Sequence, residues 1–151
     1  WRERYESMDT DRAVEMLELQ DKAVMSTLAT PIRRRSQLED PACVKVVCNQ
    51  YGEAMYFSRS PIPCAREWDD ALLDRDPPCF LQHLGLYAYR REFLLEIASL
   101  PPSPLEQLEK LEQLRVLSAG KTILVSVIDE PTIGIDTWDD YRAFVSRTTI
   151  C

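Results

Sequence analysis

The chain has 151 residues, of which 45% are hydrophobic and 28% are charged, and its formal net charge at pH 7 is −7. This length and balance predict one globular domain over residues 1–151, and the negative charge argues against nonspecific binding to nucleic acid or anionic membranes. No apolar run approaches the roughly 18 residues of a membrane helix. Five cysteines, an odd number without a C-x-x-C pair, argue against a disulfide framework or a zinc site.

Taken in chain order, the apolar periodicity and the turn residues predict helices and strands that alternate. The predicted helices are 9–21, 91–99, 104–118 and 137–147, and the predicted strands are 23–32, 43–48, 54–58, 84–89 and 122–128. Gly52 is expected in a hairpin turn between the second and third strands, and 59–79 in an ordered loop with one helical turn. Strands separated by helices indicate an α/β fold, and the hairpin favours a mixed sheet.

The segment 104–118 carries the clearest helix signals. Ser103 is a suitable N-cap, Pro104 fits the first helical position, and Glu106 completes the S-x-x-E pattern of a capping box. Gly120 is a plausible stop. We therefore expect one uninterrupted helix over these residues.

Within that helix, Glu112 is predicted to lie on the apolar side, between Leu105 and Leu108, because successive residues are rotated by about 100°. Lys110 is expected on a more polar side. A carboxylate on an apolar face needs a partner. Glu112 therefore either forms a salt bridge or lies at a solvent-exposed rim, or it faces a polar ligand together with Gln113.

Three further residues could take part in chemistry. His83 and Tyr87 are four residues apart and share a face of the predicted strand, although a lone histidine is more often structural. Asp136 lies between the last predicted strand and helix, where it is either a metal or hydroxyl ligand or an aid to capping. Arg59 leaves a strand end and is either a surface arginine or a bidentate ligand for a carboxylate or phosphate.

Four motifs, read in order, resemble one family. They are VKVV followed by GEAMYFSRSPIP, then QHLGLYAYR, then PPSPLEQLEKLEQLRVL, and finally GIDT. Together they are similar to the 3-deoxy-manno-octulosonate cytidylyltransferases, the CMP-Kdo synthetases. The resemblance implies a nucleotide-diphospho-sugar transferase-like fold, in which this chain is the C-terminal part of a Rossmann-like three-layer α/β structure.

The resemblance also implies a reaction and a site. These enzymes transfer CMP from CTP to Kdo with Mg²⁺ and release pyrophosphate, for lipopolysaccharide synthesis in the bacterial cytoplasm, and they are homodimers. Carried over by motif, the sugar-binding residues are Arg59, His83, Tyr87, Glu112 and Gln113, and the metal ligand is Asp136. The resemblance assigns no catalytic side chain within this chain.

The chain departs from the family at its start. It has neither the strand and basic glycine loop that hold CTP nor a Q-G-D-E-P-type motif, and WRERYESMD supplies no equivalent aspartate. We therefore expect a C-terminal fragment that lacks the N-terminal CTP-binding half and has no turnover alone. Two alternatives remain: a non-catalytic interaction module that dimerises through 104–118, and a cytidylyltransferase for another acidic sugar.

Overall fold

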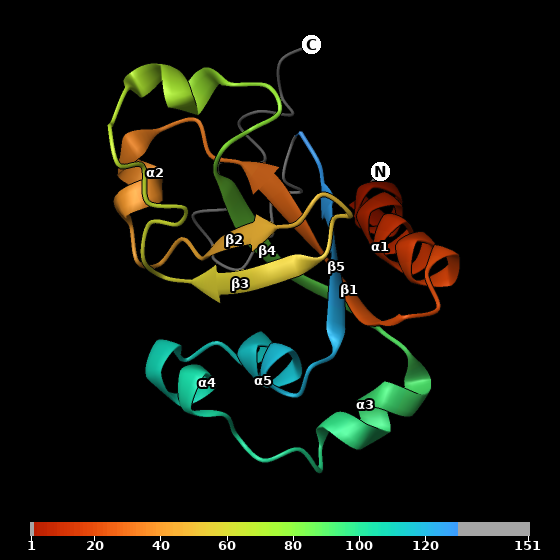
Figure 1. Ribbon diagram of the computed structural model, residues 1–151. Coiled ribbons are helices and arrows are strands. Elements are labelled where there is room, and N and C mark those ends of the chain that lie inside the picture. Colours follow the sequence, from red (N-terminus) through yellow and green to blue (C-terminus); the bar gives the residue numbers. More distant parts are fainter. Residues whose placement is uncertain (1, 130–151) are drawn as a thin grey trace.

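The computed structural model describes residues 2–129, and the side chains of residues 11–129 (Figure 1). This part of the chain contains five α-helices, one 3-10 helix and five strands. The helices are α1 (Arg2–Leu19), α2 (Arg35–Glu39), η1 (Asp70–Asp74), α3 (Arg91–Ile97), α4 (Pro104–Glu109) and α5 (Gln113–Ser118), and the strands are β1 (Ala23–Pro31), β2 (Lys45–Cys48), β3 (Ala54–Ser58), β4 (Leu81–Tyr89) and β5 (Thr122–Val127).

The five strands form one mixed sheet in the order β3-β2-β4-β1-β5. Strands β1 and β5 run parallel, while the β1–β4, β2–β3 and β2–β4 pairs are antiparallel. The predicted mixed sheet with flanking helices is therefore confirmed. The β2–β3 turn also reaches the outer edge of β5, where the Val125 N–H donates to the Gly52 carbonyl over 2.8 Å.

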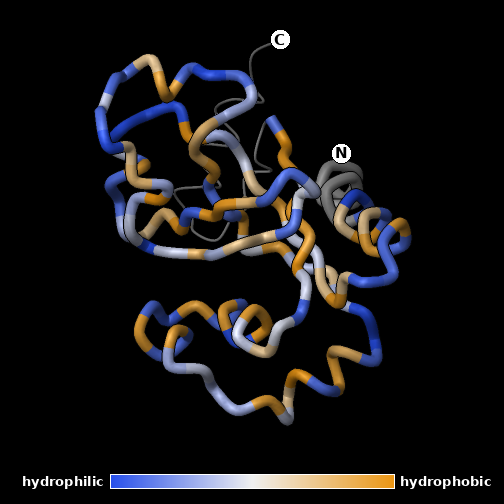
Figure 2. Tube along the Cα trace, viewed as in Figure 1, coloured by the Kyte–Doolittle hydropathy of each residue, from blue (hydrophilic) through white to orange (hydrophobic). Residues whose placement is uncertain are grey.

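Helices cover both faces of the sheet (Figure 1). On one face, Ala13 and Leu17 of α1 pack against Leu28 and Leu124. On the other, Leu111 and the α5 residues Leu114 and Val116 join the largest apolar cluster, which also includes residues of every strand except β4 among its fully buried members. Strands β1 and β5 are buried along most of their length, as expected for a sheet with helices on both faces, and much of their trace is hydrophobic in Figure 2.

The prediction of one helix over 104–118 is wrong in its middle. Its start is as expected: Ser103 and Glu106 form a capping box, and Pro104 begins the helix. The helix then ends at Glu109, because Lys110 adopts the left-handed conformation with φ 55° and ψ 47°. In one continuous helix the leucines would spread around the cylinder, whereas this break turns Leu111 into the core.

Other boundaries differ less. Helix α1 begins earlier than the predicted residue 9, α2 forms in a segment for which no helix or strand was predicted, and β4 begins at Leu81 rather than at residue 84. The helical turn predicted within residues 59–79 corresponds to η1. The predicted helix 137–147 lies outside the described residues.

A buried lysine joins β2 to its neighbouring loops. Lys45 has no exposed surface, and its ammonium donates to the carbonyls of Asp40, Cys43 and Arg59 over 2.5–2.9 Å. Burial lowers the pKa of Lys45. Three carbonyl acceptors satisfy the three ammonium protons, so this side chain fixes the loop before β2 and the end of β3 in place.

Candidate functional site

One cavity of about 440 Å³ lies between β4, the loop before β2 and the α4–α5 segment. Strand β4 contributes His83, Tyr87 and Tyr89 to its lining, and the α4–α5 segment contributes Lys110, Glu112 and Gln113. Four of the five residues predicted to bind the sugar, His83, Tyr87, Glu112 and Gln113, therefore meet at one site. They come from two elements that are far apart in the sequence, and their prediction as ligands remains a prediction.

His83 lies on the cavity wall. Its ring packs edge-on against Phe57 at 5.0 Å and lies 5.3 Å from the Tyr87 ring. Burial lowers the pKa of His83 to about 4, so the ring is neutral at pH 7. A neutral histidine offers one donor and one acceptor and cannot neutralise a carboxylate.

The Thr27 hydroxyl determines which nitrogen of His83 carries the proton. Thr27 Oγ1 lies 2.7 Å from the Leu86 carbonyl and 3.1 Å from the Leu84 carbonyl. Both carbonyls can only accept, so we assign the hydroxyl proton to the shorter contact, with Leu86. The hydroxyl oxygen must then accept from His83 Nε2, which is 2.9 Å away. The lone pair of His83 therefore resides on Nδ1, which suits a hydroxyl donor on a ligand.

Both carbonyls belong to a bulge in β4. Thr27 pairs with Tyr87 while the next residue, Leu28, pairs with Leu84, so Gly85 and Leu86 are extra residues in the ladder. The insertion has an even length, so His83 and Tyr87 remain on the same face, as predicted. Bulges commonly re-aim side chains beside a site.

The tyrosines bring hydroxyl groups to the same wall. Tyr87 and Tyr89 have ring centroids 6.0 Å apart. Burial raises the pKa of Tyr87, and the neighbouring Tyr89 and Glu112 raise it further. Tyr87 is consequently protonated at neutral pH and can donate a hydrogen bond to a ligand oxygen.

Glu112 reaches the cavity by a different route from the one predicted. It is exposed and occupies the N-cap position of α5, after the break, rather than an apolar face between Leu105 and Leu108. Gln113, which follows, is 5% exposed. The expected pairing of Glu112 and Gln113 at one site is present, although the helical geometry used to predict it is not.

Arg59 is placed outside the cavity lining. Its guanidinium donates to the carbonyls of Glu109, Pro41 and Lys110 over 2.8, 3.1 and 3.5 Å. The Glu109 carboxylate in turn accepts from the Arg59 N–H at 2.9 Å and from Ser58 Oγ at 2.7 Å. Although burial alone would raise the pKa of Glu109, these hydrogen bonds outweigh it and lower that pKa. Arg59 thus clamps the end of α4.

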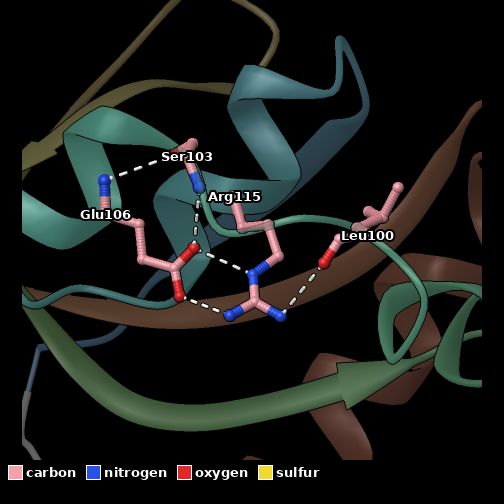
Figure 3. A network of polar contacts seen from close by, with 4 residues as sticks. All are labelled: Leu100, Ser103, Glu106 and Arg115. Carbon is pink, nitrogen blue, oxygen red and sulfur yellow. Dashed lines mark hydrogen bonds and ion pairs between the residues drawn. The ribbon is translucent and has the colours of Figure 1, made fainter.

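An ion pair between Arg115 and Glu106 fixes the other side of the break. Figure 3 shows Arg115 of α5 pointing toward Glu106 of α4, with two hydrogen bonds of 2.6 and 2.8 Å between guanidinium and carboxylate. Arg115 also donates to the Leu100 carbonyl over 3.5 Å. The same carboxylate accepts from the Ser103 N–H, which completes the capping box. The two short helices are therefore held in one orientation beside the cavity.

The predicted metal ligand, Asp136, lies outside the described residues. Within residues 11–129, His, Cys, Asp and Glu side chains form no group of three that could hold a metal ion. The cavity lining in this part of the chain has one carboxylate, Glu112. These residues alone do not fit a resident Mg²⁺, which prefers several oxygen ligands in octahedral geometry.

Comparison with known proteins decides the family. A family model described as "Cytidylyltransferase" matches residues 6–123. The chain belongs to the cytidylyltransferase family. This cytidylyltransferase chain is 49% identical over 138 residues to 3-deoxy-manno-octulosonate cytidylyltransferase of Rhodopirellula baltica, covering 91% of the chain and 55% of that protein. It is 48% identical over 124 residues to the protein of the same name from Syntrophotalea carbinolica, covering 80% and 50%.

A solved structure agrees with these relatives. It is CMP:2-keto-3-deoxy-manno-octonic acid synthetase complexed with CTP, with a TM-score of 0.79 and 33% identity over 93% of this cytidylyltransferase chain and 56% of that one. The chain is thus a portion of a CMP-Kdo synthetase-like cytidylyltransferase. It spans about half the length of the curated relatives it matches.

The comparisons correct one prediction. The chain was expected to be a C-terminal portion of the family that lacks the N-terminal CTP-binding half. That placement is wrong: the family match begins at residue 6, and the chain corresponds to the N-terminal half of the family. The prediction relied on the missing motifs and on the placement of four motifs in the C-terminal part of the family.

Sequence reasoning missed two residues of this site. Thr27 lies in an apolar run, and its contact with His83 joins positions 56 residues apart, which no local pattern could indicate. Lys110 was assigned to a polar helix side, and nothing in the sequence signals its left-handed backbone. For Thr27, a hydroxyl in a predicted buried strand was the available hint.

Proposed function

We propose that this chain carries an acidic-sugar-binding cavity of an enzyme that transfers CMP from CTP to Kdo, releasing pyrophosphate. The observation that carries the proposal is the meeting of His83, Tyr87, Glu112 and Gln113 in one cavity. The many hydroxyl groups of a sugar acid can form hydrogen bonds with these side chains, which offer an imidazole nitrogen, a phenol, a carboxylate and an amide. The similarity to proteins named for this reaction supports the same conclusion.

The parent protein of this chain acts, in this proposal, in the cytoplasm as a homodimer that supplies lipopolysaccharide synthesis. Mg²⁺ remains part of the prediction, with Asp136 as its ligand, and it would shield the charge of the triphosphate. No helix within residues 2–129 is both long and apolar enough to cross a membrane. Positioning of the sugar hydroxyl for attack on the α-phosphorus is the contribution expected of the cavity residues.

The 151-residue chain alone is expected to bind Kdo without turnover, because it spans about half the length of its relatives. Binding is measured by calorimetry, and turnover by release of pyrophosphate with CTP, Kdo and Mg²⁺. Glu112→Ala should weaken Kdo binding and leave the circular dichroism spectrum unchanged. Glu67→Ala removes an exposed carboxylate outside the cavity lining and serves as the matched control.

The outcomes separate the alternatives. Absence of Kdo binding together with binding of another 2-keto sugar acid would favour a cytidylyltransferase for that sugar. If Glu112→Ala changes self-association of the chain but leaves its affinity for the sugar unchanged, the result would favour an interaction module. For that module, the relevant observation is that Leu105 and Leu108 of α4 are 43% and 80% exposed. Formation of CMP-Kdo by the isolated chain would contradict the prediction of no turnover.

A further inference from the structure

The charge of the cavity is concentrated in two side chains. Lys110 and Glu112 both line it, on either side of Leu111, and among the lining residues that the structure describes they are the only cationic and anionic groups, since His83 is neutral at pH 7. Within the described part of the chain, an anionic ligand in the cavity therefore meets a single positive side chain. The carboxylate beside it disfavours a second negative group and favours hydroxyl donors.

The backbone of Lys110 is held from both sides. Leu111 is 6% exposed and anchored in the core, while the Arg59 guanidinium donates to the carbonyls of Glu109 and Lys110. The φ of Lys110 is 55°, and Lys110 is the one non-glycine residue with positive φ among those the structure describes. A residue other than glycine, asparagine or aspartate is uncommon there, and such positions cluster at functional sites.

Arg59 is not available for the same task. Its Nε, Nη1 and Nη2 atoms each donate to a backbone carbonyl, and it does not line the cavity. Among its side-chain contacts, the one with the Lys110 carbonyl involves a residue that lines the cavity. Arg59 thus acts on the site as a positioning residue.

We propose that Lys110 binds the carboxylate of the sugar acid and Glu112 its hydroxyl groups, so that Lys110 selects acidic over neutral sugars. This inference rests on the proposed function, because it assigns the orientation of the ligand in the same cavity. The sugar acid lies with its charged end toward the break between α4 and α5. Its hydroxyl-bearing chain then extends along Glu112, Gln113 and the β4 wall.

The test compares the dissociation constants of Kdo and Kdo carboxamide, which has the same shape without the charge. The unmodified chain should bind Kdo about 5-fold more tightly, the value expected for an exposed ion pair. Lys110→Met should abolish this ratio by weakening Kdo alone, and Lys110→Arg should retain it. Lys22→Met removes a positive charge from an exposed side chain outside the cavity lining and should leave the ratio unchanged.

Arg59→Gln should also reduce the ratio, but not further when Lys110→Met is already present, because Arg59 acts through Lys110. Equal weakening of both ligands by Lys110→Met, or no weakening, overturns the inference and leaves the proposed function standing. Binding of neither ligand by the unmodified chain overturns both. If Lys22→Met also abolishes the preference for Kdo over Kdo carboxamide, that preference arises from long-range charge, and the role of Lys110 is overturned.

Discussion

Thr27 links the sheet to the cavity, and Thr27→Val tests that link. Thr27 has no exposed surface, and its hydroxyl joins His83 Nε2 to the bulge carbonyl of Leu86. Valine has nearly the same shape but neither donates nor accepts. The substitution therefore leaves the His83 N–H and the Leu86 carbonyl without this partner inside the protein.

Each buried polar group that loses its partner costs about 1–3 kcal/mol. Two such groups predict a loss of about 3 kcal/mol in the free energy of unfolding. For a chain of this length, that loss corresponds to a decrease of about 9 °C in melting temperature, at about 3 °C per kcal/mol. Thr27→Ser keeps the hydroxyl and loses one methyl group, which costs about 1 kcal/mol.

The measurement is urea unfolding followed by circular dichroism, with equal slopes required for a direct comparison of the variants. Thr27→Val should be less stable than Thr27→Ser by about 2 kcal/mol, the difference between the two losses. If Thr27→Ser is the less stable of the two, or if Thr27→Val costs under about 0.5 kcal/mol, the hydroxyl does not hold the bulge and the histidine as described.

Further predictions concern pH, the ionic contact and the cavity wall. His83 is the single histidine of the sequence, so its proton NMR signals should titrate with a midpoint near pH 4. In the unfolded chain the same histidine takes up its proton near pH 6.5. The contribution of neutral His83 to the free energy of unfolding is therefore complete above pH 6.5 and is lost as the pH falls toward 4. An NMR titration midpoint above about pH 6 would refute the lowered pKa. Glu106→Gln should lower the free energy of unfolding by about 2 kcal/mol, whereas Glu39→Gln, which removes the exposed contact with Arg35, should cost under about 0.5 kcal/mol. If thermal unfolding shows that the two variants lose equal stability, the partly buried Glu106–Arg115 pair contributes no more than the exposed Glu39–Arg35 pair, which contradicts the prediction. Gly85→Ala should leave stability unchanged and weaken Kdo binding, because an added Cβ meets no atom within 4 Å and Gly85 lines the cavity. Unchanged affinity in calorimetry would place that methyl group outside the ligand volume.

Local signals predicted the start of α4 well and its end poorly. Ser103, Pro104 and Glu106 act on one another within a single turn, so their pattern was sufficient. The end depends on Arg59, which is 50 residues away and captures the Glu109 carbonyl and carboxylate. A helix that stops because another element binds its last turn carries no stop signal of its own.

The cavity residues likewise include some that local sequence patterns could predict and some that they could not. His83 and Tyr87 could be placed together because strand residues an even number apart share a face, and the two-residue bulge preserves that parity. Glu112 and Gln113 were expected at a ligand site because a continuous helix would place Glu112 on its apolar side. The structure does not support that reason, since the helix is broken before Glu112. The pairing survives because adjacent residues at a helix start remain close whatever precedes them.

Lys45 gives this chain a built-in chemical probe of its own opening. Its ammonium has no exposed surface and is enclosed by three carbonyls. An amine-directed reagent can modify it only while the loop before β2 and the end of β3 separate. The rate of modification at this one lysine, compared with that of exposed lysines, therefore reports how often the wall beside the cavity comes apart under native conditions.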